Sequence, residues 1–507
     1  MTAAGVEFTD PQRPDLRSRV MSGFLWKIAS QGVTQVLKTG TVIVLARLLA
    51  PRDFGVAAMA LVASAFVVTY ADGGLGLALV QKESITDADC NSVFWASSAI
   101  GLLMAAVCFG VAPLVADFYH TAEVKPLLEV LSLSFLFTGL GSTHRSLHLR
   151  SMHFRVLEIR TMASGVIGGL VTVGVAVAGG GAWAFILGDV TGAAASTVLL
   201  VAMGGWWPRF TLEWRRVREL GAFGLRYLGG TTFLTLNGTA DNILIGRALG
   251  DAALGIYGLA YSVILVPLSR LAQPIHQLLS PAFARLQSDT KALGDAWLRA
   301  TRLLLMLFLP VMITIAVTSP DIVNVLFGEK WDAAVPVMRI LAPVCALISI
   351  QGVVDAVIQA VGEMKIYLRM CTLSFVFTIT AFLIGLHWGV VGVAAGFAIA
   401  ITSFMLVYVT LVVRKIHASG WRFAKAVADL AMGGIALAAV EVVVFSMLND
   451  TPVGPVVRIA ATGTAGVVTF GLFCMWRDRD SLVDLIHLAT ERLPGSRRFL
   501  PQALQSA

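Results

Sequence analysis

Apolar stretches long enough to cross a lipid bilayer recur along the sequence and limit what the chain can fold into. A bilayer-spanning helix needs roughly 20 mostly apolar residues, and stretches of that kind follow one another from residue 22 to residue 475. A transmembrane β-barrel would instead show short segments that alternate between apolar and polar residues. Hydrophobic residues make up 57% of the chain. Charged residues make up 14%, against roughly 25% in soluble domains. The sequence therefore predicts an all-α integral membrane protein.

The hydropathy pattern divides into about fourteen candidate membrane-spanning helices, with ends set to within a few residues. Many are longer than a bilayer requires, so we expect them to tilt or to extend beyond the lipid. The spans are expected near residues 22–48, 54–80, 91–115, 126–147, 158–179, 182–203, 222–249, 252–283, 300–319, 334–361, 366–386, 389–413, 423–447 and 456–475.

Lys and Arg residues set the expected orientation, because cytoplasmic connections carry an excess of them. If the N-terminus is cytoplasmic, the connections on that side hold most of these residues, including the runs at 209–218 and 414–425. Both termini are therefore expected in the cytoplasm. The net charge of +7 then reflects topological anchors, so we expect no nucleic-acid partner. The opposite connections hold Arg47, Arg52, Lys125, Arg247, Lys330 and Arg458.

A weak internal repeat indicates a duplicated architecture. Residues 41–60 align with 241–260 without a gap, and Gly55 matches Gly255 in this alignment. Spans one to six then correspond to spans seven to twelve. Six helices per copy keep both copies in the same orientation, so we expect two pseudo-symmetric six-helix lobes around a central cavity.

The repeat also predicts how the chain is organised. The first lobe is expected at 22–208 and the second lobe at 209–420, followed by an additional helix pair at 421–476. Residues 1–21 and 477–507 are expected to be cytoplasmic segments.

Motifs of a soluble enzyme are missing from the sequence. Membrane glycosyltransferases and polymerases usually display catalytic acids on large extracytoplasmic loops, whereas the longest outer loop expected here, near 319–333, is short. The acidic triplets at 87–89 and 478–480 resemble metal-binding acids, but both lie in charged, cytoplasmic segments. We therefore expect no catalytic residue and no metal site.

Charged residues inside the spans are the candidates for function, because each costs about 3 kcal/mol or more unless it faces water or a partner. Lys38 lies near the middle of the first span, and Gln31 and Gln35 share its helical face. We expect this polar stripe to line a cavity in which Lys38 contacts an anionic substrate. An ion pair that holds two helices together is the alternative.

Asp241 lies on the seventh span, which corresponds to the first span in the repeat. Its carboxylate is expected either to bind a coupling cation, Na⁺ or H⁺, or to pair with Lys38. The other candidates are Arg145, Arg270 and His276 for substrate binding, and Asp355 and Asp72 for ion coupling or charge pairing.

Two spans are expected to bend. Asp72 precedes a glycine run at 73–76 that would loosen the second span, and Pro267 and Pro274 interrupt the eighth. Transporters bend or bind their cargo at such positions, although membrane helices also tolerate proline without such a role.

Two stretches carry a resemblance to a known family. They read "LARLLAPRDFGVAAMALV…ADGGLGLALVQ" in the first lobe and "DNILIGRALGDAALGIYGLAYSVILVPLSRLAQPIHQLLSPAFARLQSD" in the second. With these motifs the chain resembles Wzx-type polysaccharide flippases, in particular the colanic-acid-exporter-like branch. These flippases belong to the MOP superfamily, which also holds MATE exporters and the lipid II flippase. The resemblance covers roughly residues 20–480.

The resemblance implies a function in the bacterial plasma membrane. A polyprenyl-pyrophosphate-linked oligosaccharide would move from the inner to the outer leaflet by alternating access, with polysaccharide polymerase or export machinery as further partners. It also implies a basic contact to the lipid pyrophosphate, assigned to Lys38 and Arg145, and coupling to a cation gradient, assigned to Asp241. No cofactor is implied beyond Na⁺ or H⁺ as the coupling ion.

Two other functions stay open. A MATE-like multidrug or cation antiporter would want acidic residues in the first lobe, whereas the first span bears Lys38 and no carboxylate. An integral-membrane polymerase or glycosyltransferase is disfavoured by the short outer loops. Because a diphosphate cannot cross hydrocarbon unaided, the positively charged first span favours an anionic cargo.

Overall fold

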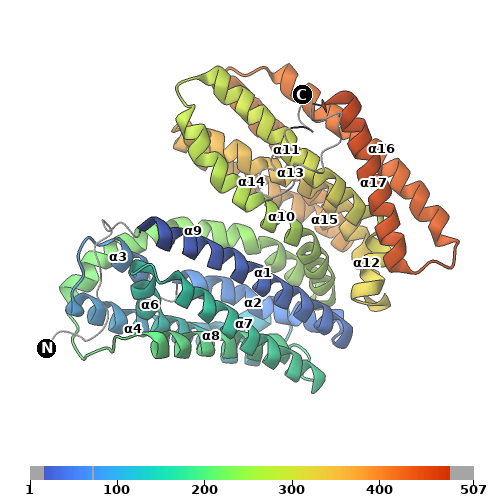
Figure 1. The fold of residues 1–507 in the computed structure, drawn as a ribbon. Coiled ribbons are helices and arrows are strands. Elements are labelled where there is room, and N and C mark those ends of the chain that lie inside the picture. Colours follow the sequence, from blue (N-terminus) through green and yellow to red (C-terminus); the bar gives the residue numbers. More distant parts are fainter. Residues whose placement is uncertain (1–15, 71–73, 480–482, 484–507) are drawn as a thin grey trace. The chain divides into compact units, whose positions relative to one another are not determined.

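The computed structural model of the protein describes residues 16–70, 74–479 and 483, and all regular secondary structure in these residues is helical. Contacts divide the chain into two compact units, Met1–Gly258 and Leu259–Ala507. Within each unit, long helices run side by side as a bundle (Figure 1).

The first unit holds the helices up to the beginning of α10, which continues into the second unit. These helices are α1 (Leu16–Leu48), α2 (Pro51–Tyr70), α3 (Leu75–Gln81), α4 (Asp87–Tyr119), α5 (Val124–Leu131), α6 (Leu133–Arg150), α7 (Phe154–Val177), α8 (Trp183–Met203), α9 (Trp214–Leu249) and α10 (Asp251–Arg285).

The second unit holds the remaining helices, among which α16 and α17 form an antiparallel pair along α11 (Figure 1). These elements are α11 (Thr290–Val317), α12 (Ser319–Leu326), the 3₁₀ turn η1 (Glu329–Trp331), α13 (Ala334–Ala360), α14 (Met364–Gly385), the 3₁₀ turn η2 (Leu386–Trp388), α15 (Gly389–Lys415), α16 (Gly420–Asn449) and α17 (Pro455–Arg477).

Each expected span coincides with one helix or with two consecutive helices. Among the described residues, nine segments are long and apolar enough to cross a membrane, and one of them, Met364–Lys415, holds both α14 and α15. The prediction of an all-α, multi-pass membrane protein is therefore confirmed. The number of fourteen spans stays a prediction.

The second and eighth spans differ in how they accommodate their helix breakers. Within the second span, Gly74 is a turn residue that precedes α3, and it adopts a φ of 72° that glycine tolerates without strain. Asp72 itself lies outside the described residues. The eighth span, α10, is one continuous helix through Pro267 and Pro274.

The compact units are defined by contacts between residues, whereas the expected lobes are defined by the sequence repeat. Contacts place α9 in the first unit, where it packs on α2, α3 and α4. The boundary between residues 208 and 209 follows from sequence correspondence instead, and the five expected segments stay a prediction.

Small residues bring neighbouring helices into close contact in both units. The motif "GDVTG" at 188–192 lies where α8 packs on α7, and a Cβ added to Gly168 would lie 2.7 Å from the Gly188 carbonyl oxygen. The motif "GVAAG" at 392–396 lies where α15 packs on α14, and a Cβ added at its first glycine would lie 2.2 Å from the Gly385 carbonyl oxygen. Glycines spaced in this way are typical of packed membrane helices. Since α8 and α15 are spans six and twelve, equivalent helices of the expected repeat use the same packing device.

Side-chain caps mark where several helices begin. Thr86 and Asp89 form a capping box at the start of α4. Asp289 accepts hydrogen bonds from two backbone N–H groups at the start of α11, and Ser419 accepts one at the start of α16. These caps satisfy backbone donors that the first turn of a helix leaves unpaired.

Candidate functional site

One side of the polar stripe on α1 is used for packing against α7. The buried Ser30 hydroxyl donates a hydrogen bond to Glu158 of α7. Further along the two helices, Gly169 of α7 lies beside Thr41, whose Oγ1 would lie 3.4 Å from a Cβ added there. These contacts fix which face of α1 turns toward the body of the first unit.

The other side of the stripe is open. Gln31 and Lys38 are exposed in the first unit, while Gln35 is half-buried and its amide donates to the Thr39 hydroxyl at 3.0 Å. Among the described residues, no carboxylate forms an ion pair with Lys38. Within the first unit, the Lys38 ammonium group and the Gln31 amide are therefore exposed on α1.

Further basic residues lie on α6 and α7. Arg145 is exposed on α6 and interacts electrostatically with Arg160 of α7. The Arg160 guanidinium donates to the Ser196 and Thr161 hydroxyls, each at 3.0 Å. The contacts of Ser30 with Glu158 and of Thr41 with Gly169 align α1 with α7. In this alignment Lys38 lies six residues, or about 9 Å, further along the helix axis than Arg160. The first unit thus carries basic side chains at two levels along its helix axes.

Asp241 is half-buried on α9. Its Oδ1 accepts a hydrogen bond from the backbone N–H of Asn242 at 2.8 Å. Among the described residues it forms no ion pair, so it is not joined to Lys38 in this structure. Its roles in ion coupling or charge pairing stay predictions.

Two predicted residues make contacts within the second unit. The His276 ring Nε2 lies 3.0 Å from the Ser349 carbonyl oxygen, and Gly352 leaves room for the ring because a Cβ there would lie 2.1 Å from ring Cε1. Asp355 accepts a hydrogen bond from the Tyr408 hydroxyl at 2.8 Å. These contacts join α10 to α13 and α13 to α15. Roles in binding stay predictions, and the Arg270 side chain lies outside the described residues.

Arg150, in the basic cluster at the end of α6, has a structural use. Its guanidinium donates to the carbonyl groups of Leu79, Val80, Lys82 and Glu83, with distances of 3.2 Å to the first, 3.1 Å to the second and 2.7 Å to the last. These carbonyls lie at the C-terminal end of α3, where a helix lacks donors and favours a cation. Arg150 therefore caps α3.

The acidic triplet at 87–89 also has a structural use. Asp89 is buried and accepts hydrogen bonds from Lys82 at 2.7 Å and Arg216 at 2.8 Å, in addition to capping α4 with Thr86. In the triplet at 478–480, Asp478 pairs with Arg302 at 3.4 Å. Both carboxylates are occupied by basic side chains of neighbouring helices.

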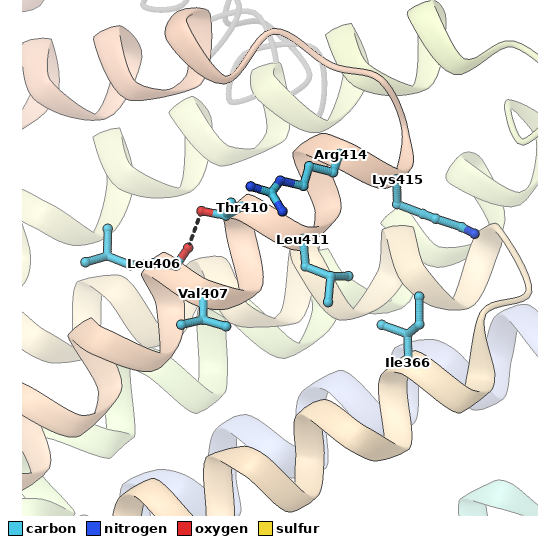
Figure 2. A pocket seen from close by; sticks show the side chains of 7 residues that line it. All are labelled: Ile366, Leu406, Val407, Thr410, Leu411, Arg414 and Lys415. Atoms are coloured by element: carbon cyan, nitrogen blue, oxygen red, sulfur yellow. Dashed lines mark hydrogen bonds between the residues drawn. The ribbon is translucent and has the colours of Figure 1, made fainter.

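A groove of about 620 Å³ runs along α15 near its C-terminus. Thr410 donates to the Leu406 carbonyl at 2.7 Å, and Arg414 and Lys415 extend in different directions at the basic end (Figure 2). Lys415 pairs with Glu363 at 2.6 Å. The groove holds none of the predicted site residues. Its lining comprises Ile366, Leu406, Val407, Thr410, Leu411, Arg414 and Lys415.

Three acidic residues in the helices escaped the sequence reasoning. Glu158 holds Ser30 as described above, Asp189 is exposed on α8 and accepts from Ser134 at 3.2 Å, and Glu441 is wholly buried on α16, where it accepts from Thr314. Asp189 and Glu441 are lone acids in apolar stretches, which is the signal that could have found them, whereas Glu158 lies between Arg155 and Arg160.

These features define a class of protein: a multi-pass helical membrane protein with a cation exposed on a polar helix face. The profile of the family described as polysaccharide biosynthesis protein matches residues 44–336. Because this match covers more than half of the chain, the protein belongs to that family.

Three curated relatives agree with the assignment. The chain is 26% identical to the teichuronic acid biosynthesis protein TuaB of Bacillus subtilis (strain 168), over 69% of this chain and 73% of that protein. It is 26% identical to the lipopolysaccharide biosynthesis protein WzxC of Escherichia coli (strain K12), over 78% and 82%. It is 30% identical to the succinoglycan biosynthesis transport protein ExoT of Rhizobium meliloti (strain 1021), over 62% and 64%.

Solved structures share the fold. The lipid II flippase MurJ in an inward closed conformation matches with a TM-score of 0.73 and 14% identity, over 90% of this chain and 99% of that chain. An inward-facing MATE family transporter of the MOP superfamily matches with a TM-score of 0.63 and 15% identity, over 76% and 94%. The sequence-based prediction of a Wzx-type relative with a MOP fold is confirmed.

Proposed function

We propose that this protein is a flippase that moves a polyprenyl-pyrophosphate-linked oligosaccharide from the inner to the outer leaflet of the bacterial plasma membrane. It acts as a transporter by alternating access and catalyses no covalent chemistry. Its membership of the polysaccharide biosynthesis family supports the glycan part of this proposal, and the names of TuaB, WzxC and ExoT support it further. The shared fold with a lipid II flippase is compatible with a lipid-linked cargo.

The exposed Lys38 is the observation that carries the proposal. A pyrophosphate needs a cationic, hydrated surface to pass through the membrane, and an ammonium group in a helix of a membrane protein is expensive unless it faces such a surface. Lys38 has no described carboxylate partner, and Gln31 shares its exposed face. Arg145 provides a second cation in the same unit. The lipid tail can stay in the bilayer while the head group moves along these residues.

The orientation and the energy source are part of the same proposal. Both termini lie in the cytoplasm, as the distribution of Lys and Arg favours. A Na⁺ or H⁺ gradient drives transport through Asp241, whose carboxylate lacks a described cationic partner. The polymerase or export machinery of the polysaccharide would receive the cargo on the outer side.

The proposal is tested by exchanging Lys38 and following the lipid-linked glycan. Deletion of the gene should cause the glycan to accumulate on the inner leaflet. Complementation with Lys38→Ala should restore export at least about tenfold less well, because a charge-assisted hydrogen bond contributes roughly 1.5–3 kcal/mol. Lys38→Arg should keep most of the activity.

Lys27, also exposed on α1, provides a matched control. Lys27→Ala should export normally at equal protein level in the membrane. Export by Lys38→Ala at the wild-type rate would remove Lys38 from the cargo path, and a deletion strain without accumulated lipid-linked glycan would contradict the flippase function itself.

A further inference from the structure

Glu441 is a wholly buried carboxyl group in the second unit, and the cargo path proposed above does not use it. It projects from α16, and its Oε1 accepts a hydrogen bond from the Thr314 hydroxyl of α11 at 2.5 Å. Its Oε2 has no hydrogen-bond partner among the described residues. An unsatisfied buried oxygen is costly, so this atom needs an explanation.

Helix α17 is shaped around this carboxyl group. A Cβ added to Gly466 would lie 2.0 Å from Glu441 Oε1, so a larger residue there would displace the Glu441 side chain. One turn before Gly466, Thr462 is wholly buried, and its hydroxyl has no partner among the described residues. By contrast, Thr464 and Thr469 of the same helix donate to backbone carbonyls one turn back. The packed helices α16 and α17 thus each bury one side-chain oxygen that has no partner among the described residues.

Charged groups around Glu441 are scarce and already occupied. Between Arg302 and its C-terminus, α11 carries no charged residue, and Glu441 is the only one on α16 between residues 430 and 449. Arg458 of α17 is bound to Asp321 of α12 and to Asn449. An ionised Glu441 would therefore be a buried charge without a partner among the described residues, which is strongly unfavourable.

We propose that Glu441 is a proton-binding site and that its side chain is neutral at neutral pH. The proton resides on Oε2, while Oε1 accepts the hydrogen bond from Thr314. The buried carboxyl group then carries no charge. The site belongs to the helix pair α16–α17, and it does not depend on what the protein transports.

A metal cation fits the same place poorly. Hard cations such as Ca²⁺ and Mg²⁺ take about six or more oxygen ligands, whereas Glu441 and Thr314 offer one carboxyl group and one hydroxyl. The backbone at Gly466 also fills the space against Oε1. A proton needs neither the ligands nor the space.

Infrared spectroscopy of the purified full-length protein in lipid nanodiscs tests the proposal directly. At neutral pH, the wild type should show the C=O stretching band of a protonated carboxyl group, and Glu441→Gln should lose it. Thr314→Val should move the band to higher frequency without removing it, because the hydrogen bond to Oε1 is lost. Asp450→Asn, which changes an exposed carboxylate at the end of the same helix, should leave it unchanged.

Thermal unfolding provides a second readout that does not rely on one variant folding well. Raising the pH should lower the melting temperature of the wild type, because loss of the proton leaves a buried charge. In Glu441→Gln, the decrease in melting temperature should be smaller, because this side chain cannot ionise. Replacing choline by Na⁺ should affect the wild type and Glu441→Gln equally. An infrared spectrum unaltered by Glu441→Gln would overturn the proposal, as would stabilisation by Na⁺ of the wild type but not of the variant.

Discussion

The corner between α1 and α2 and the corner between α9 and α10 are built from residues 200 positions apart in the sequence, and the two corners touch. A Cβ added to Gly55 of α2 would lie 1.7 Å from the Asp251 carbonyl oxygen, and a Cβ added to Gly255 of α10 would lie 1.9 Å from the Pro51 carbonyl oxygen. Each glycine thus accepts the first turn of the other helix. This reciprocal contact is what a duplicated corner produces.

The same two regions differ in their ionisable residues. Lys38 of α1 corresponds to Gly238 of α9, and Thr41 corresponds to Asp241. The packing residues are therefore shared between the copies, whereas the charge is positive in one and negative in the other. The scaffold thus requires glycine at equivalent positions in both copies, whereas the charged residues that are candidates for function differ between the copies.

Gly255→Ala should break the shared scaffold and have the largest effect on stability. The new methyl group would overlap a backbone carbonyl that cannot move without its helix, and overpacking of this kind costs about 3 kcal/mol. The melting temperature of the purified protein should fall clearly. Gly258→Ala is the matched control, because a Cβ on this glycine one turn along α10 would meet nothing within 4 Å. Equal melting temperatures for the two variants would show that the corners do not need their close contact.

Asp241→Thr makes the second copy resemble the first at the position where their charges differ. Transport should lose its dependence on the cation gradient, while stability should change by less than about 1 kcal/mol, because the carboxylate has no described ion pair to lose. Uptake or export should be measured with and without the gradient. Asp117→Asn, which alters an exposed carboxylate on α4, should keep the dependence. A gradient response that survives Asp241→Thr would leave Asp241 without a coupling role.

The fold could be predicted from the sequence because each long apolar stretch has one stable form in a membrane. A helix satisfies its own backbone hydrogen bonds, so the spans follow from local composition. The turn at Gly74 could be predicted for the same reason, since a glycine run weakens any helix. Lys38 could likewise be singled out, because a lysine inside an apolar helix is unusual wherever the helix lies.

Contacts made by side chains across helices could not be predicted in this way. Arg150 caps α3, a use that depends on the end of α3 lying beside the end of α6. Glu441 was overlooked although it is a lone acid in an apolar helix, and its setting requires Gly466 and Thr314 from two other helices. The spacing of residues along one helix carries no information about such partners.

Arg52→Ala should have the smallest effect and should show what holds the two corners together. Arg52 donates to Glu123 at 2.7 Å and to Asp251 at 3.2 Å, and its counterpart in the second copy is Ala252. The arginine is thus supplied by one copy only, although it pairs with an acid of each copy, and its side chain is 59% exposed. Exposed pairs contribute little, so the melting temperature should fall by at most about 2 °C.

Varying the ionic strength provides the control for Arg52→Ala. Because exposed charges are screened, the difference between the wild type and Arg52→Ala should shrink at high ionic strength, whereas the effect of Gly255→Ala should not. A salt-insensitive loss as large as that of Gly255→Ala would mean that the ion pairs hold the corners. The expected result would show that the corners are held together by the reciprocal glycine contact, which both copies share and which salt does not weaken.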